Sequence, residues 1–132
     1  MQQRVAIARA LILNPKVLLM DEPFAALDSQ YRKFLRKNII EIWQKTRKTI
    51  IFVTHSINEA LSMADRIYIF TARPATVKAS YEILLPHPRD AGCSEYLRLK
   101  EQIEYDIAQE FEKVINEQPF YNQVDHLLRI EF

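Results

Sequence analysis

Two short apolar segments, with an amphipathic stretch between them, most constrain what this chain can fold into. Residues 17–20 (Val-Leu-Leu-Met) and Thr49–Thr54 are apolar runs of the kind found in strands buried on both faces of a parallel sheet. The residues between them repeat apolar side chains at helical spacing, which predicts a helix over about 30–46 capped by Asp28 or Ser29. The strand–helix–strand order therefore predicts an α/β domain with parallel strands.

The rest of the chain shows the same two patterns. A short helix is expected to begin with the capping-box pair Ser56 and Glu59, and a long helix with Ser94. Pro119 is expected to end the long helix, and the residues after it are ambiguous. The segments predicted in this way are helices over 2–13, 57–64 and 94–117 and strands over 67–70 and 77–85.

The glycine content limits the chemistry of the chain. The sequence has one glycine, Gly92, whereas a loop that cradles phosphates with its backbone N–H groups needs several residues without a Cβ atom. These 132 residues therefore contain no phosphate-binding loop. Any nucleotide phosphates must be held by another segment.

The composition is ordinary for a globular domain, with 48% apolar and 27% charged residues. A net charge of +1 provides no strong field, so no nucleic-acid partner is expected. No apolar run approaches the roughly 20 residues that span a bilayer. The single cysteine, Cys93, cannot form a disulfide within the chain and has no predicted helper base, so a cytosolic location without a cysteine nucleophile is expected.

Two adjacent carboxylates follow the first predicted strand. Asp21 and Glu22 come directly after the apolar run, and two such groups at the end of a buried strand repel each other unless a cation offsets their charge. Mg²⁺ suits this place, held by Asp21 directly or through water. Glu22 is then free to orient and deprotonate an attacking water. The alternative is that the pair begins a solvated loop or caps a helix.

His55 follows the second predicted strand. Ligands of open parallel sheets bind at the carboxyl ends of the strands, so we expect Asp21, Glu22 and His55 to point into one crevice. His55 is suited there to contact a terminal phosphate as a hydrogen-bond donor. The alternative is a histidine at a helix entry that is satisfied by the backbone.

Residues 1–70 carry motifs that resemble ATP-binding cassette (ABC) transporter ATPase subunits. The stretch VLLMDEP resembles the Walker B strand of that family with its glutamate, and AALDS resembles the D-loop that follows it. The stretches VTH and EALSMADR resemble the switch-histidine region. The stretch TARPATVKASYEILLPHPRD and the helix after it are similar to importers of nitrate, sulfonate and taurine. Subunits of polyamine, thiamine-precursor or other importers are the alternatives. In the family a signature motif precedes the helix that starts here at Gln2, and only its last position, Met1, is present. The chain is therefore expected to be a fragment or a truncated reading frame.

The resemblance implies roles for single residues. By this resemblance Asp21 binds Mg²⁺ and Glu22 is the catalytic base. His55 senses the γ-phosphate of ATP, and Asp28 makes a contact across a dimer interface. The implied fold is the C-terminal portion of a P-loop NTPase with a mostly parallel sheet, followed by a long C-terminal helix.

The same resemblance implies a division of the chain and a function. A partial ATPase domain is expected over 1–90, and a helical extension with a tail over 91–132. The intact protein would use ATP and Mg²⁺ as a homodimer that drives a membrane permease, with a solute-binding protein as an indirect partner. It would lie on the inner face of the cell membrane and energise uptake of a small nitrate-, sulfonate- or taurine-like solute.

Without a phosphate-binding loop, this chain alone is not expected to hydrolyse ATP. An alternative is a non-catalytic truncated protein that binds a permease or a full-length ATPase subunit. An ABC-type ATPase that acts on DNA or ribosomes is disfavoured by the net charge and by the importer-like stretch. In the family a further strand lies between the strands here at 50–54 and 67–70, so these two are expected either to pair directly or to keep unpaired edges.

Two further groups of residues receive structural interpretations. The apolar stripe of the helix over 30–46 is expected to be core, and a cluster of basic residues on the same helix is expected to be a solvated face. The members of the stripe are Tyr31, Phe34, Leu35, Ile39, Ile42 and Trp43, and those of the basic cluster are Arg32, Lys33, Arg36 and Lys37.

Overall fold

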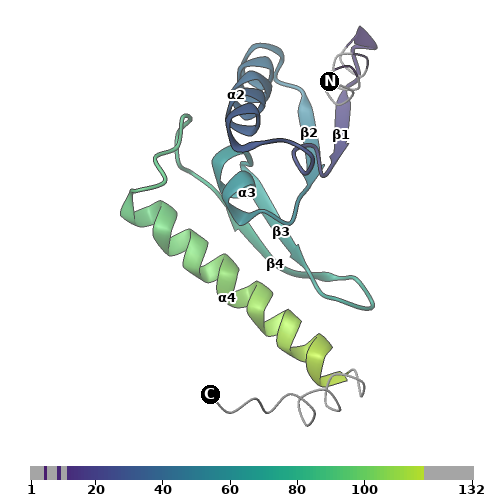
Figure 1. The fold of residues 1–132 in the computed structure, drawn as a ribbon, viewed down its shortest axis with the longest axis vertical. Coiled ribbons are helices and arrows are strands. Elements are labelled where there is room, and N and C mark those ends of the chain that lie inside the picture. Colours follow the sequence, from purple (N-terminus) through teal and green to yellow (C-terminus); the bar gives the residue numbers. More distant parts are fainter. Residues whose placement is uncertain (1–4, 6–8, 10–11, 118–132) are drawn as a thin grey trace. The chain divides into compact units, whose positions relative to one another are not determined.

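The structure is a computed structural model that describes Val5, Arg9 and residues 12–117 (Figure 1). The predicted helix over 2–13 lies mostly outside these residues, although Val5, Arg9 and Ile12 are helical. The chain divides into two compact units, Met1–Glu59 and Ala60–Phe132, and the predicted limits 1–90 and 91–132 stay a prediction. The elements in chain order are β1 (Val17–Asp21), α2 (Ser29–Thr46), β2 (Thr49–Val53), α3 (Ile57–Met63), β3 (Arg66–Phe70), β4 (Val77–Glu82) and α4 (Ser94–Glu117).

In the first unit, β1 and β2 form a parallel pair, as the sequence predicts. The register places Val17 opposite Thr49 and Asp21 opposite Val53, so both strands end at the same edge. The crossover between them contains α2, whose 18 residues exceed the dozen or so that a parallel connection needs. This pairing sets the carboxyl ends of β1 and β2 next to each other.

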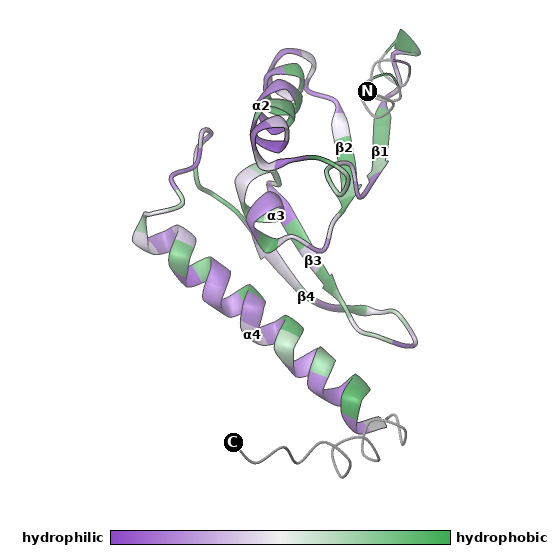
Figure 2. Ribbon diagram, viewed as in Figure 1, coloured by the Kyte–Doolittle hydropathy of each residue, from purple (hydrophilic) through white to green (hydrophobic). Residues whose placement is uncertain are grey.

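The burial of β1 differs from the prediction. Leu18 and Met20 are buried, whereas Val17 and Leu19 are 48% and 73% exposed. Figure 2 shows β1 in the colour of apolar residues except at its end, where Asp21 lies, and only alternate residues of the strand are buried. The prediction of a strand buried on both faces is therefore wrong within the described residues. A continuous apolar run permits burial on both faces, but neighbouring elements decide it.

Helix α2, in the same unit, begins as predicted. The Asp28 side chain accepts hydrogen bonds from the backbone N–H groups of Gln30 (3.0 Å) and Tyr31 (2.9 Å), which is the geometry of a helix N-cap. Leu35 and Ile39 are buried, but half of each of the Tyr31 and Phe34 surfaces is exposed. The apolar stripe covers about half of the helix circumference, wider than the buried face of a typical surface helix, so only its middle is core.

In the second unit, β3 and β4 pair antiparallel, with Ile67 opposite Tyr81. The described strands form one parallel and one antiparallel pair, so the prediction of a mostly parallel sheet holds only in part. Only residues 71–76 connect β3 to β4, whereas a parallel crossover needs a dozen or more. Among the described strands, β2 pairs with β1 and β3 pairs with β4. The arrangement expected for the strands at 50–54 and 67–70, which lie in different units, stays a prediction.

Helix α4 has the predicted bounds. Its first half buries Leu99 and Ile103, whereas Ile107 and Phe111 further along are exposed. Apolar and polar bands alternate along its length in Figure 2. The apolar spacing therefore predicts the helix correctly and its buried extent only in part.

Polar contacts join β4 to α4. The Lys78 ammonium donates to the Asp106 carbonyl (2.7 Å) and forms an ion pair with Glu110 (3.2 Å), and both charged side chains are mostly buried. The Tyr81 hydroxyl donates to the Asp106 carboxylate at 2.6 Å. These bonds fix the helix against the strand at a place where apolar contacts alone would permit sliding.

The Tyr81 contact predicts a change of stability at alkaline pH. Burial, together with the hydrogen bond to Asp106, raises the pKa of Tyr81 from 10.0 to about 12. The folded chain therefore holds this proton more tightly than the unfolded chain, so the contribution to stability is complete below pH 10.0 and is lost between pH 10.0 and about 12. We expect urea midpoints to fall more steeply over this range for the wild type than for Tyr81→Phe. Parallel profiles would contradict the prediction.

Arg89, to which the sequence gives no role, is the most enclosed charged side chain of this unit among those described. Its side chain is 1% exposed and forms a 3.4 Å ion pair with Asp65. The guanidinium also donates to backbone carbonyl groups near the end of α3 and in the segment after β4. The acceptors with the shortest distances are Leu61 O (2.7 Å), Ala64 O (2.7 Å) and Leu85 O (3.0 Å).

Candidate functional site

The candidate site begins where β1 and β2 end together. The backbone N–H of Glu22 donates to the Val53 carbonyl at 2.9 Å, which extends the parallel ladder by one residue beyond Asp21. His55 lies two residues beyond Val53, the last residue of β2. The sequence prediction that the ends of these strands meet at one edge is therefore confirmed, and predicted site residues follow both strands.

The structure brings Glu22 and His55 into contact. The His55 Nδ1 atom lies 2.9 Å from the Glu22 Oε1 atom, although the residues are 33 positions apart in sequence. The His55 side chain is 80% exposed and the Glu22 side chain 36% exposed. An exposed pair of this kind contributes about 0–1 kcal/mol to stability, so the contact does little for folding and leaves the ring accessible to a ligand.

The backbone of Glu22 has an unusual conformation. Its φ angle is 43°, in the left-handed region that few residues with a side chain adopt. Such a residue costs on the order of 1–3 kcal/mol, and it persists because its surroundings hold it. The Glu22 carbonyl accepts from Ala25 N–H at 3.2 Å, and Phe24, at 1% exposed, anchors the turn. The turn directs the Glu22 carboxylate toward the end of β2, where His55 meets it.

Asp21 is the last residue of β1 and is exposed. Within residues 12–117, Val5 and Arg9, no three His, Cys, Asp or Glu side chains are grouped so as to hold a metal ion. Mg²⁺ that binds together with a nucleotide takes only one or two protein carboxylates, because phosphates and water complete its shell. An exposed carboxylate at the strand end fits that donor set.

Asp28 acts in this structure as the N-cap of α2. Both amide contacts use its Oδ1 atom, which places the carboxyl group at the start of the helix. The predicted contact of Asp28 with a second subunit is a separate role that stays a prediction.

Sequence reasoning missed a cluster of three side chains beside the site. The Thr54 hydroxyl donates to Glu59 Oε2 at 2.7 Å, and Arg32 Nε forms an ion pair with Glu59 Oε1 at 3.6 Å. Arg32 is therefore partly buried and paired, and its assignment to a solvated face is wrong. A buried carboxylate requires a partner, and the basic side chains of α2 were the available cations.

The capping-box prediction for α3 holds only in part. The Glu59 backbone N–H points to the Ser56 hydroxyl at 3.4 Å, as expected of a cap. The Ser56 backbone N–H, however, donates to the Thr54 hydroxyl at 3.1 Å. In the expected capping box the Glu59 carboxylate would accept from the Ser56 backbone N–H. Instead, the Thr54 hydroxyl accepts from that N–H and donates to the Glu59 carboxylate.

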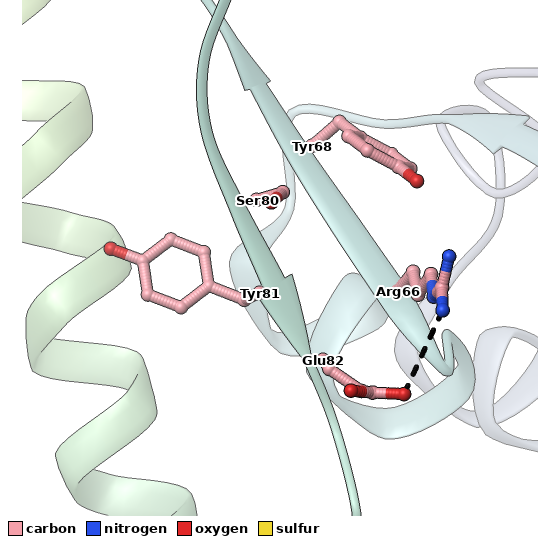
Figure 3. Close-up of a pocket in the computed structure, with 5 residues that line it drawn as sticks. All are labelled: Arg66, Tyr68, Ser80, Tyr81 and Glu82. Carbon is pink, nitrogen blue, oxygen red and sulfur yellow. Dashed lines mark ion pairs between the residues drawn. The ribbon is translucent and has the colours of Figure 1, made fainter.

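A separate hollow lies on the second unit, with a volume of about 250 Å³ (Figure 3). Figure 3 shows Tyr68 and Arg66 projecting from one side of the β3–β4 hairpin. The Tyr81 ring projects from the other side of the hairpin, toward α4. An ion pair of 3.8 Å joins Arg66 to Glu82 across the hollow. None of the predicted site residues lines it, so it is not part of the candidate site.

Comparisons with known proteins agree with the motifs. A family model for ABC transporters matches residues 1–25. An uncharacterised ABC transporter ATP-binding protein of Methanocaldococcus jannaschii is 50% identical over 103 residues, which cover 78% of this chain and 39% of that protein. The chain is a relative of ABC transporter ATP-binding proteins. The resemblance stated from the sequence is confirmed.

Other ABC transporter relatives include importer subunits. An aliphatic sulfonates import ATP-binding protein of Bacillus cereus is 43% identical over 103 residues, covering 78% of this chain and 41% of its own length. A nitrate import ATP-binding protein of Synechocystis is 41% identical over 105 residues, covering 80% of this chain and 40% of its own length. The chain thus spans about two fifths of the length of the curated relatives it matches.

Proposed function

We propose that this chain forms part of the ATP-hydrolysing subunit of an ABC importer. The observation that carries the proposal is the 2.9 Å contact between Glu22 and His55 at the joint end of β1 and β2. An acid and a histidine that approach from two strands can share one substrate molecule between them. The similarity to ATP-binding subunits of sulfonate and nitrate importers supports ATP as that substrate.

Each site residue has a proposed part in hydrolysis. Glu22 orients a water molecule and accepts its proton, while His55, held through Nδ1, directs its other ring nitrogen at the terminal phosphate. Asp21 would hold the Mg²⁺ ion that accompanies ATP, which would supply positive charge beside the phosphate oxygens. Asp28 is proposed to contact a second subunit, which fits a residue exposed at the start of a helix.

The remaining assignments follow from the relatives. The proposed assembly is a homodimer of ATPase subunits on the cytoplasmic side of a membrane, attached to a permease and served by a solute-binding protein. Sulfonate-like or nitrate-like anions are the proposed solutes, because relatives are named for importing them. No helix in the described part of the chain is long and apolar enough to cross a membrane.

ATP binding tests the proposal. The sequence has no phosphate-binding loop, so titration of the 132-residue chain with MgATP is expected to give no heat of binding. A fusion that places this chain behind the preceding part of the Bacillus cereus relative, which by family resemblance carries that loop, is expected to bind MgATP. The matched control replaces the loop lysine of the fusion by alanine, which removes the contact to the phosphates.

The results of these binding and turnover measurements distinguish the proposed ATPase function from a non-catalytic one. A folded fusion that fails to bind MgATP contradicts the proposed function. ATP turnover by the chain alone, abolished by Glu22→Gln, contradicts its inactivity in isolation. The alternative hypothesis is a non-catalytic protein that binds a permease or an ATPase subunit. This hypothesis gains support if the fusion protein co-purifies with a permease but does not hydrolyse ATP.

A further inference from the structure

The Glu59 carboxylate lies between two segments of the first unit. Glu59 is 5% exposed, and each of its oxygen atoms meets a different segment. Oε2 accepts a hydrogen bond of 2.7 Å from the Thr54 hydroxyl, and Oε1 lies 3.6 Å from Arg32 Nε. A buried carboxylate that loses a partner is left with uncompensated charge, so separation of either segment from Glu59 is unfavourable.

The first segment carries His55. Thr54 is its direct neighbour, and the same hydroxyl that donates to Glu59 also accepts from the Ser56 backbone N–H at 3.1 Å. The residues on both sides of His55 are therefore tied to Glu59. Since the His55 side chain itself is 80% exposed, these bonds, together with the Glu22 contact, fix where its ring lies.

The second segment carries Asp28. Arg32 Nη2 donates to the Leu27 carbonyl at 2.9 Å, directly before Asp28 in sequence. The Arg32 backbone N–H donates to the Asp28 carbonyl, also at 2.9 Å, as the first turn of α2 requires. One guanidinium thus links the turn before α2 to the Glu59 carboxylate.

We propose that Glu59 is a positioning residue that couples the segment of Asp28 to the segment of His55. A displacement of Asp28, as when a second subunit docks on it, is passed through Leu27, Arg32, Glu59 and Thr54 to the histidine. The inference rests on the proposed function, since that function supplies the subunit contact of Asp28 and the phosphate contact of His55. It adds a route by which subunit docking aligns the phosphate contact.

A local role for the same residues makes a different prediction. If Glu59 and Thr54 serve only to begin α3, a change at Arg32 has no reason to reach His55. If Glu59 couples the two segments, a change at either end of the chain of contacts alters the other end. The distinction is visible without nucleotide, in the chemical environment of the His55 ring and of the Asp28 amide.

Nuclear magnetic resonance of the labelled 132-residue chain, without ATP and at one pH, tests the coupling. The variants are Arg32→Met and Thr54→Val, with Lys33→Met as the matched control because Lys33 is an exposed neighbour of Arg32. Arg32→Met is expected to shift the His55 ring signals, and Thr54→Val to shift the Asp28 amide signal. Lys33→Met is expected to leave both in place. Thr54→Ser, which retains the hydroxyl, is expected to restore the wild-type spectrum.

A combination of variants sharpens the result. Once Thr54→Val has cut the route, adding Arg32→Met is expected to cause no further shift of the His55 ring signals. Shifts confined to the segment that carries each substitution overturn the proposal. If Arg32→Met does not fold, the Thr54→Val and Thr54→Ser pair decides through the Asp28 amide. Because no ATP is used, failure of the fusion to bind or hydrolyse ATP leaves this result unaffected, and the reverse also holds.

Discussion

Replacing Glu22 by glutamine in the fusion protein is expected to lower the rate of ATP hydrolysis by about 10²–10⁴-fold, the usual contribution of a general base. Glutamine has the same size and can still meet His55 Nδ1, so the fold of the site is retained. It cannot accept the proton of an attacking water, because its amide is not basic. Phosphate release under saturating MgATP measures the loss, and calorimetry is expected to show that MgATP still binds.

Glu41→Gln supplies the control for that measurement. Glu41 lies on α2, about half exposed, in a 4.0 Å ion pair with Lys37. The substitution makes the same chemical change away from β1 and β2 and is expected to leave the rate unchanged. A Glu22→Gln enzyme that keeps most of the activity would show that another group takes the proton.

Arg89→Met is expected to destabilise the chain by at least about 2 kcal/mol, because each buried carbonyl group that loses its donor costs about 1–3 kcal/mol, whereas Asp65, at 60% exposed, stays solvated. Methionine retains much of the length of arginine but donates no hydrogen bonds. The carbonyl groups of Leu61 and Ala64, each 2.7 Å from the guanidinium, would lose their charged donor. A domain of this kind has only about 5–15 kcal/mol of net stability, so much of it would be lost.

Urea unfolding of the 132-residue chain measures this effect, with Arg98→Met as its control. Arg98 is 56% exposed and pairs with Glu95 within one turn of α4, and an exposed pair of this kind contributes little to stability. A loss below about 1 kcal/mol for Arg89→Met would mean that water replaces the guanidinium at those carbonyl groups.

Features set by neighbours in sequence were predictable. The Asp28 cap depends on residues within one turn, and the bounds of α4 on a regular apolar spacing. The predicted Ser94 cap is displaced by one residue, since Ser94 is the first residue of α4 and Cys93 accepts from the Tyr96 N–H through its sulfur at 3.4 Å. The contact of Glu22 with His55 was also within reach, because parallel strands in register bring their ends together. The short link between β3 and β4 also permits only an antiparallel pair, although no orientation was predicted for the fourth strand.

Features set by tertiary neighbours were not predictable. Apolar spacing shows that Leu19 and Phe34 belong to a strand and a helix, but their exposure depends on what else covers those faces. The pairing of Arg32 with Glu59 joins two helices across 27 residues, and several basic side chains of α2 were equally plausible partners. The enclosure of Arg89 likewise depends on carbonyl groups from segments that no local pattern relates to it.

At position 22, the residue that the proposed catalysis requires is not the residue that gives the most stable backbone, because Glu22 has a left-handed conformation. Glycine adopts a φ of 43° without steric cost, so a glycine at position 22 would relieve the chain of that cost while deleting the proposed base. A screen that rewards heat resistance alone would therefore drift toward inactive proteins at this position. Directed evolution of this chain would have to select for turnover and stability together to keep a glutamate there.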